Sequence, residues 1–481
     1  MNAFVSKLAE SLGAGAVLSD PADMAKYVRS WSGNETGKAL CVVRPANTAE
    51  LSRALAAAFE AGIPVVPQSG NTGLAGGSIP DDSGRAIVLS LERMNRIREI
   101  SASALTMTVE AGCVLARLHE TVEAQGLFFP LNFGAKGSCM IGGNLATNAG
   151  GSNVVRYGNT RELCLGMEVV LPDGRVMDLL SGLRKNNTGY DLRDLFVGSE
   201  GTLGIITAAT MKLYPLPKAR ATAIVAVESL ADALLVLNRV QAESGGAVEA
   251  FEMMPDAFLR QAQRHKPELL QPFAHLPRYA AMIEIAATSD AAAIADSDGV
   301  LPVAATLQRA CEAALEHGLI QDAVFAASEG QRQEIWKLRE AALEVTNSVK
   351  SKIGFDISLP LERIHDFVAE TQKIVDASVK GVVLNPLGHL GDGNLHLGIW
   401  CEPDADAEAF KAGAAKMKSA VLDLLARSGG SFSAEHGIGS HKLAEMRAYK
   451  DPVALDAMRA IKAALDPKGI MNPGRTIPAG N

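Results

Sequence analysis

The sequence lacks the patterns that would place the protein in a membrane or an oxidising compartment. No apolar run approaches the ~20 residues of a membrane-spanning helix. The first residues, MNAFVSKLAESLG, carry Lys7 and Glu10 inside their apolar stretch and do not have the form of a signal peptide. No CxxC pair occurs, and the six cysteines stand apart at positions 41, 113, 139, 164, 311 and 401. We therefore expect a cytoplasmic protein with free thiols and no disulfide framework or structural zinc cluster.

Two further absences narrow the function. There is no excess of positive charge: the net charge of −8 argues against broad nucleic-acid binding, which needs a basic face. There is also no Walker lysine motif and no GxGxxG opening a helix, so a P-loop or an ordinary dinucleotide fold is disfavoured. What the chain does have is length. Its 481 residues, 48% of them hydrophobic, suffice for two or three domains.

The order of apolar stretches indicates mixed helix and sheet. Short strands flank a helix predicted over residues 48–61. Pro215-Leu-Pro217 marks a domain boundary. Beyond it, two β-α-β blocks predict a domain with helices on one face of a largely antiparallel sheet. A long helix is predicted over 329–348, and strands are predicted over 355–359 and 382–387.

The stretch GHLGDGNLHLG, residues 388–398, sets two histidines seven residues apart. Asp392 and Gly393 are predicted to form a two-residue hairpin turn, because Asp-Gly between strand-like residues is a strong signal for one. His389 would then lie directly opposite His396, with Cβ atoms roughly 5 Å apart. Two imidazoles so placed can share one metal ion. A glycine-rich turn with two unrelated histidines is the alternative.

A second segment, SAEHGIG at residues 433–439, offers a further metal ligand. Glu435 can supply an oxygen, while the adjacent His436 points elsewhere and stays free as a base. Histidine suits that role at neutral pH, since its unperturbed pKa is ~6.5. The purely structural alternative for His436 is a histidine that caps a helix.

Three loops in the first half are unusually rich in glycine. They are PQSGNTGLAGG at 67–77, GSCMIGGNLATNAGG at 137–151 and GSEGTLGIIT at 198–207. Glycine lets successive backbone N–H groups turn toward an anion. Tight turns alone would explain isolated glycines better than three such loops, because each glycine costs roughly 0.5–1 kcal/mol in backbone entropy. We expect the loops to hold a phosphate-bearing cofactor.

Seven motifs occur in one order over nearly the whole chain: the three loops, VRYGNTRELCLGMEVVLPDG, GHLGDGNLH, SAEHGIG and the terminal NPGR. Together they resemble the FAD-dependent D-2-hydroxy acid dehydrogenases of the vanillyl-alcohol oxidase and p-cresol methylhydroxylase superfamily. The resemblance implies an α+β fold with a p-cresol methylhydroxylase-type FAD-binding domain at 1–217, whose core is at about 38–217. It also implies a substrate-binding cap with a largely antiparallel sheet at 218–430, and a segment at 431–481 that completes the FAD and active sites.

The resemblance assigns FAD to the loops and to the end of the chain. Ser69 to Leu74 cradle the pyrophosphate, Ile206 lies on the adenine side, and Asn472 lies on the flavin side. The first loop offers no histidine for covalent attachment, so we expect non-covalent FAD. The full expected set is Pro67, Ser69, Gly70, Asn71, Thr72, Gly73, Leu74, Gly77, Pro130, Gly137, Ser138, Ile141, Gly142, Asn144, Thr147, Asn148, Gly150, Gly151, Gly204, Ile206 and Asn472.

The same resemblance implies a divalent metal, with zinc expected, bound by His389, His396 and Glu435. His389 also borders the substrate. The metal holds the substrate's carboxylate and hydroxyl oxygens and acidifies the hydroxyl. His436 removes that proton while hydride leaves the α-carbon for the flavin. Arg339 is expected to grip the carboxylate with two hydrogen bonds.

Three positions depart from the 2-hydroxyglutarate pattern. At Leu343, Gly354 and Gly398, the D-2-hydroxyglutarate dehydrogenases have threonine, lysine and asparagine, respectively. Their loss removes hydrogen bonds worth roughly 1.5–3 kcal/mol apiece to a charged tail. Lys352 is close enough in sequence to replace one and is included as a substrate-binding residue. We therefore expect oxidation of D-lactate or another 2-hydroxy acid with a small or apolar tail, with D-2-hydroxyglutarate as the alternative.

The partners and two rival functions stay open. The electron acceptor is an electron-transfer flavoprotein, a quinone, a cytochrome or oxygen, and it could bring the protein to a membrane surface. A homodimer is the expected oligomer, because dimers are the commonest assemblies. A metal-dependent hydrolase would use only the His-His-Glu set and would leave the glycine loops unexplained. A flavoprotein of the same fold without net redox chemistry is the second rival.

Overall fold

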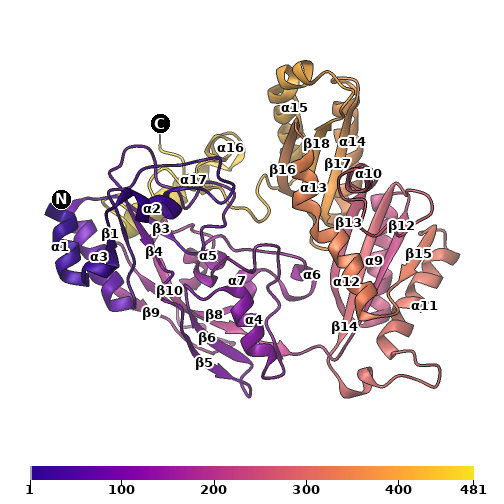
Figure 1. Cartoon of the computed structure of the whole chain (residues 1–481), viewed down its shortest axis with the longest axis horizontal. Helices are drawn as coiled ribbons and strands as arrows, with labels where there is room; N and C mark the ends of the chain where they lie inside the picture. The colour runs from indigo at the N-terminus through magenta and orange to yellow at the C-terminus, as the bar shows by residue number, and fades with distance from the viewer. Residues whose placement is uncertain (1–2, 481) are drawn as a thin grey trace. The chain divides into compact units, whose positions relative to one another are not determined.

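The computed structural model describes residues 3–480. The chain divides into two compact units (Figure 1). The first comprises Met1–Gly150, Gly158–Leu216 and Glu435–Asn481, and the second comprises Gly151–Tyr157 and Pro217–Ala434. In the part of the chain that is described, no helix combines the length and apolarity that a membrane span requires.

The first unit contains two main sheets. The four-stranded sheet has the order β1 (Val17–Leu18), β2 (Cys41–Val43), β4 (Ile87–Ser90), β3 (Val65–Gln68), in which β2, β4 and β3 are parallel. The five-stranded antiparallel sheet has the order β5 (Ile97–Ser101), β6 (Thr106–Glu110), β10 (Ile205–Lys212), β8 (Cys164–Val170), β9 (Val176–Asp178). A short pair joins β7 (Leu127–Phe128) to β11 (Tyr214–Pro215).

Helices of the first unit cover these sheets. The predicted helix is confirmed as α3, Thr48–Ala61: Asn47 caps its first turn, and Gly62 ends it in the left-handed conformation. Leu51 and Leu55 of α3 are buried with the strands. The other helical elements are α1 (Ala3–Leu12), η1 (Ala14–Ala16), α2 (Pro21–Val28), α4 (Leu115–Glu123), α5 (Ile141–Ala146), α7 (Thr160–Leu163), α8 (Arg193–Phe196), α16 (Leu443–Tyr449) and α17 (Pro452–Leu465).

The second unit is built on one seven-stranded sheet whose neighbouring strands are all antiparallel. The strand order is β15 (Asp322–Phe325), β12 (Ala219–Val227), β14 (Tyr279–Ala287), β13 (Val248–Pro255), β17 (Val382–His389), β18 (Asn394–Cys401), β16 (Lys352–Ser358). Its helical elements are α6 (Val154–Tyr157), α9 (Leu230–Ser244), α10 (Asp256–His265), η2 (Asp290–Ala293), α11 (Pro302–Glu316), α12 (Glu329–Glu340), α13 (Ala342–Ser348), η3 (Leu361–Arg363), α14 (Ile364–Asp376), η4 (Leu390–Asp392) and α15 (Ala407–Arg427).

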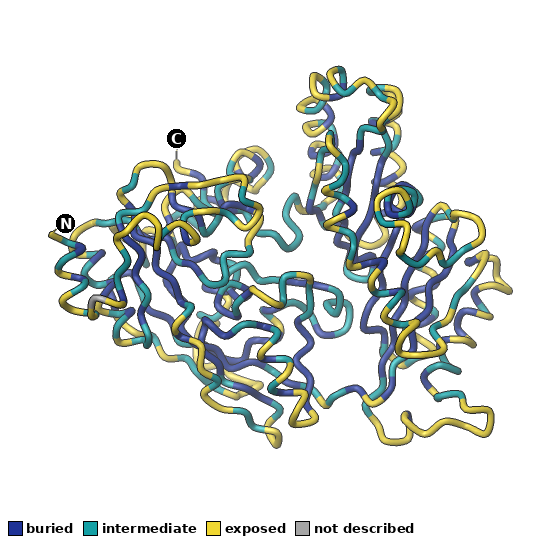
Figure 2. Tube along the Cα trace, viewed as in Figure 1, coloured by how far each residue is buried: buried dark blue, intermediate teal, exposed yellow. Residues whose placement is uncertain are grey.

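Helices cover both faces of this sheet. On one face, Met254 and Trp400 of the strands pack with Phe258 of α10 and Ile335 of α12. Every residue of β13 is buried, so the opposite face is covered as well (Figure 2), and α9, α11 and α14 also contact the strands. The expectation of helices on a single face is therefore wrong for the central strands, although the largely antiparallel sheet is confirmed. The helix predicted over 329–348 is two helices, α12 and α13, that meet at Ala341.

The histidine hairpin exists, but its predicted turn and register are wrong. Residues 390–393 form a four-residue loop, in which η4 is closed by Gly393 in the left-handed conformation. His389 pairs with Asn394, and His396 pairs with Leu387. Leu390 is fully buried, which draws it into the core instead of leaving it in the strand. Because alternate residues of a strand share a face, His389 and His396 still lie on the same face, as diagonal neighbours.

We expect Gly393→Ala to destabilise the second unit. The backbone at Gly393 has φ +82°, and an added Cβ would lie 2.4 Å from the carbonyl oxygen of Leu359. Left-handed strain in a residue other than glycine costs about 1–3 kcal/mol. The midpoint of chemical denaturation should therefore fall.

Gly413→Ala is the matched control. Gly413 lies inside α15, and an added Cβ there would meet nothing nearer than Met417 Cε at 3.8 Å. Alanine is favoured over glycine in a helix interior by roughly 0.5–1 kcal/mol, so this midpoint should rise. A Gly393→Ala protein at least as stable as the parent chain would contradict the turn.

Candidate functional site

The glycine loops of the first unit touch one another through their backbones. Ser69 follows β3, and its hydroxyl donates to the carbonyl of Ala111 (2.8 Å). An added Cβ on Gly143 would lie 2.4 Å from the Ser69 carbonyl oxygen, and one on Gly70 would lie 2.8 Å from the Met140 nitrogen. The loops at 67–77 and 137–151 can approach this closely only because these positions lack side chains.

Glu200 connects the third loop to the C-terminal segment of the first unit. Its buried carboxylate accepts hydrogen bonds from the backbone N–H groups of Ile438 and Gly439, both at 2.8 Å. Its own N–H donates to the carbonyl of Ala146 (2.8 Å). Burial raises the pKa of Glu200, although the two N–H groups oppose that shift. Glu200 thus fixes the last residues of the SAEHGIG segment. Of that segment, the part from Glu435 onward belongs to this unit.

Asn472 gives the clearest sign that a ligand belongs among these loops. Its side-chain amide donates to the carbonyls of Gly77 (2.9 Å) and Glu200 (2.7 Å). Its Oδ1 atom is buried and has no hydrogen-bond partner within residues 3–480. A buried acceptor without a donor is costly in a folded protein, so a bound group that donates to Asn472 fits the site. The residues present therefore fit a polar cofactor such as FAD.

The other residues expected to contact FAD lie in the same loops or next to them. Asn71 and Asn148 hold left-handed backbones, at φ 51° each. Asn148 Oδ1 accepts from the N–H of Arg161 (2.9 Å). Gly73 and Gly137 have open space where a Cβ would stand. Gly151 belongs to the second unit, whereas the remaining residues of the expected set belong to the first; their contacts with FAD stay predictions.

In the second unit, the two histidine rings meet on the sheet face covered by α10 and α12. Their centroids are 5.2 Å apart, and their planes are inclined at 81°. Asp356 of β16 is the strand partner of His396, and the Asp356 Oδ1 to His396 Nδ1 distance is 3.8 Å. Two imidazoles with a carboxylate beside them are donors that zinc and similar divalent metals accept. The residues therefore fit a metal centre.

Glu252 of β13 forms hydrogen bonds with a histidine and an arginine on this face. It is the strand partner of His389 and has no exposed surface. Its Oε1 accepts from His389 Nδ1 (2.7 Å), and its Oε2 accepts from Arg339 Nε (2.7 Å). Burial alone would raise the pKa of Glu252, but the charges and hydrogen bonds of Arg339 and His389 hold this pKa at about 2.

Arg339 and Lys352 differ in how many of their hydrogen-bond donors already have acceptors. Arg339, on α12, is buried, and its NH2 atom has no partner among the described residues. Lys352 Nζ donates to the carbonyls of Thr346 and Val349 and to Asn347 Oδ1, at the end of α13. An ammonium group has three donors, so a substrate would have to displace one of these acceptors. The role of Lys352 in substrate binding stays a prediction.

Glu435 and His436 lie in the first unit, with His436 Nε2 3.7 Å from Glu435 Oε1. The preceding residue, Ala434, ends the second unit, and its N–H donates to the carbonyl of Asp356 (3.3 Å). The chain therefore passes directly from the backbone of Asp356, the strand partner of His396, to Glu435. The structure thus brings His389 and His396 together within the second unit. Glu435 and His436 belong to the first unit, and their part in the site stays a prediction.

The sequence interpretation missed two glutamates that position these groups. Glu252 stands in the apolar strand AVEAFEMMP, where a charge that is never exposed must have a partner. The apolar composition of the strand therefore indicates that Glu252 is paired, but it does not identify Arg339 and His389 as the partners. Glu200 lies in a loop in which acidic residues are ordinary, and nothing in the sequence distinguished it.

Comparison with known proteins gives the family. Residues 39–180 match the FAD binding domain family, and residues 216–476 match the C-terminal domain of FAD linked oxidases. A mitochondrial D-2-hydroxyglutarate dehydrogenase of Bos taurus is 38% identical over 467 residues, which cover 96% of this chain and 81% of that protein. A D-2-hydroxyglutarate dehydrogenase of Xanthomonas citri pv. viticola is 35% identical over 472 residues, covering 98% and 96%.

Solved structures agree on the fold. Substrate-bound p-cresol methylhydroxylase has a TM-score of 0.73 at 15% identity, covering 99% of this chain and 96% of that one. A structure of alkyldihydroxyacetonephosphate synthase has a TM-score of 0.71 at 16% identity, covering 98% and 86%. The predicted fold class and the resemblance to FAD-dependent dehydrogenases of this superfamily are both confirmed. The chain belongs to the family of FAD-linked oxidases and is an FAD-dependent oxidoreductase.

Proposed function

We propose that the protein oxidises a D-2-hydroxy acid to the 2-oxo acid, using non-covalent FAD and a divalent metal, with zinc as the first candidate. His389, His396 and Glu435 are the proposed ligands. The pair of histidines on one sheet face, with His389 held by Glu252, is the observation that carries the proposal. The names of the D-2-hydroxyglutarate dehydrogenase relatives support the substrate class.

The chemistry divides between the bound groups and the chain's own residues. When bound, the metal supplies a Lewis acid that acidifies the substrate hydroxyl, and FAD supplies the hydride acceptor. His436 takes the hydroxyl proton as the hydride leaves the α-carbon, so the C–O single bond becomes a carbonyl. Arg339 offers its unpartnered NH2 group to the substrate carboxylate. Glu252 keeps Arg339 in place through its Nε atom.

The substrate's tail is proposed to be small or apolar, as in D-lactate. Gly354 and Gly398 pair across β16 and β18. Beside Gly398 the apolar ring of Trp400 fills the space, with its Nε1 2.4 Å from where a Cβ would stand. Space beside Gly354 is open where a Cβ would stand. Burial lowers the pKa of Lys352, and its three hydrogen bonds tie it to α13. A charged tail would therefore lack a ready cation, although the relatives' names keep D-2-hydroxyglutarate as the second candidate.

Family membership also bears on the rival functions. The metal-dependent hydrolase has no use for an FAD-binding domain, which the match over residues 39–180 indicates. The electron acceptor, whether an electron-transfer flavoprotein, a quinone, a cytochrome or oxygen, is not needed to test the reductive half of the reaction.

We expect D-2-hydroxy acids to bleach the visible flavin band in an anaerobic titration. D-lactate should do so at lower concentration than D-2-hydroxyglutarate, and the L-isomers should not do so. Prior removal of metal with a chelator should abolish bleaching, and added zinc should restore it. A yellow protein that no hydroxy acid bleaches would overturn the proposed reaction while leaving the family assignment intact.

His436→Asn should slow flavin reduction by about 100-fold or more, because a positioned general base contributes 10²–10⁴-fold. Stopped-flow absorbance measures this step without any electron acceptor. His441→Asn is the control within the same segment, since His441 contacts Glu35 (2.6 Å) and has no proposed role in the chemistry. A His436→Asn enzyme with the parent rate would exclude His436 as the base.

Gly354→Lys should shift preference toward D-2-hydroxyglutarate. The position is exposed on the edge strand β16 and has room for a side chain, so the fold should tolerate lysine. A new ammonium near the tail should raise kcat/KM for the dicarboxylate about tenfold, as expected for one charge-assisted hydrogen bond of roughly 1.5 kcal/mol. An unchanged ratio of kcat/KM values for the two acids would place the tail elsewhere.

A further inference from the structure

We propose that Glu252 is a positioning residue that sets both the metal-binding nitrogen of His389 and the orientation of Arg339. The inference deepens the proposed function and rests on it for the roles of His389 and Arg339. Glu252 itself touches neither the substrate nor the reacting atoms in this scheme. It acts only through its two partners.

Glu252 determines which tautomer of His389 forms. An ionised carboxylate accepts hydrogen bonds and cannot donate them. The 2.7 Å contact between Glu252 Oε1 and His389 Nδ1 therefore requires the proton on Nδ1. In the neutral ring this leaves the lone pair on Nε2, which becomes the metal-binding nitrogen. Such carboxylate partners typically improve the metal affinity of a histidine site by 10–100-fold.

Glu252 also orients Arg339. The other oxygen of the same carboxylate accepts from Arg339 Nε at 2.7 Å. That contact turns the guanidinium so that NH2, which has no partner in the described part of the chain, remains to donate. One carboxylate with both oxygens engaged thus fixes the histidine and the arginine relative to each other. Since Glu252 is fully buried on a central strand, the geometry cannot drift without disturbing the sheet.

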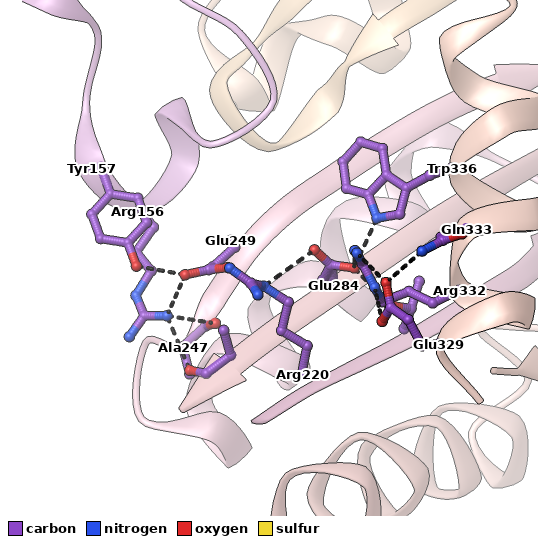
Figure 3. Close-up of polar contacts among 12 residues, drawn as sticks. Arg156, Tyr157, Arg220, Ala247, Glu249, Glu284, Glu329, Arg332, Gln333 and Trp336 are labelled. Atoms are coloured by element: carbon purple, nitrogen blue, oxygen red, sulfur yellow. Dashed lines mark hydrogen bonds and ion pairs between the residues drawn. The ribbon is translucent and has the colours of Figure 1, made fainter. Parts of the chain in front are cut away.

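A neighbouring glutamate provides a matched comparison. Glu284 of β14 is also buried on this sheet face, and it also anchors α12, by accepting from Arg332 NH1 (3.0 Å) and Trp336 Nε1 (2.8 Å). Figure 3 shows Arg332 and Trp336 converging on it, with Arg220 on its other side. Glu284 is a buried glutamate that holds the same helix without contacting a histidine. Replacing Glu284 therefore measures the effect of loosening α12 without any change at a histidine.

The experiment compares Glu252→Gln with Glu284→Gln in the full-length protein loaded with FAD. Zinc affinity is measured without substrate, by competition with a chromogenic chelator after removal of bound metal. Glutamine can turn an N–H group toward His389 Nδ1, which would favour the wrong tautomer. We expect Glu252→Gln to bind zinc 10–100-fold more weakly and Glu284→Gln to remain within about threefold of the parent chain.

A second variant guards against loss of folding. Glu252→Asp keeps the buried negative charge beside Arg339 but shortens the side chain by one methylene. It should bind zinc with an affinity between those of the parent and Glu252→Gln. It should also raise KM for the hydroxy acid more than it lowers kcat, because Arg339 loses its support. Thermal melting and flavin absorbance check that fold and cofactor are retained.

The outcomes separate this inference from the proposed function. Equal zinc affinity in Glu252→Asp and the parent, or equal losses in Glu252→Gln and Glu284→Gln, would overturn the positioning role. A parent chain that is bleached by hydroxy acids but binds no zinc would also overturn it, while leaving the oxidation intact. A parent chain whose zinc affinity depends on Glu252 but whose flavin is never bleached would uphold the inference and reject the oxidation.

Discussion

Neutralising buried carboxylates is the constraint on which the second unit depends. Glu249, Glu252 and Glu284 are all buried, and an unpaired buried charge would strongly destabilise the fold. Each is matched by at least one arginine. Arg339 pairs with Glu252. Figure 3 shows Arg156 and Arg220 with Glu249, and Arg220 and Arg332 with Glu284. The pairs with Arg332 and Arg339 attach α12 to the sheet, so the same contacts that dock the helix also present its side chains to the site.

A strand irregularity makes this arrangement possible. The pairing of β13 with β14 shifts between Val248 and Ala250, which leaves Glu249 as an extra residue. Such a bulge lets Glu249 and Ala250 both oppose Glu284, so that Glu249 can reach Arg156 and Tyr157 of the segment 151–157. A regular strand would place Glu249 on the opposite face from Glu252. The bulge thus adds Glu249 to Glu252 and Glu284, the buried glutamates already on the face that holds the metal candidates.

Local signals in the sequence predicted well what depends on local chemistry. The helix predicted over residues 48–61 is α3. The glycine loops, the two histidines and the SAEHGIG segment stood out by their local sequence, and their roles stay predictions. The failures have a common physical cause, which is tertiary packing. The burial of Leu390 changed the hairpin register, and the pairing of Glu252 with Arg339 joins residues 87 positions apart. No propensity or motif encodes such a pairing.

The order of the chain through the two units has a consequence for synthesis. The chain passes between the units after Gly150, Tyr157, Leu216 and Ala434, so most of the second unit is one uninterrupted insert within the first. The first unit obtains Ile438 and Gly439 for Glu200, and Met471 as the bridge partner of Val65, only when the last residues have been made. On the ribosome, the inserted unit therefore completes its sheet while the surrounding unit still waits for its final segment. Neither unit can be obtained whole by cutting the gene once.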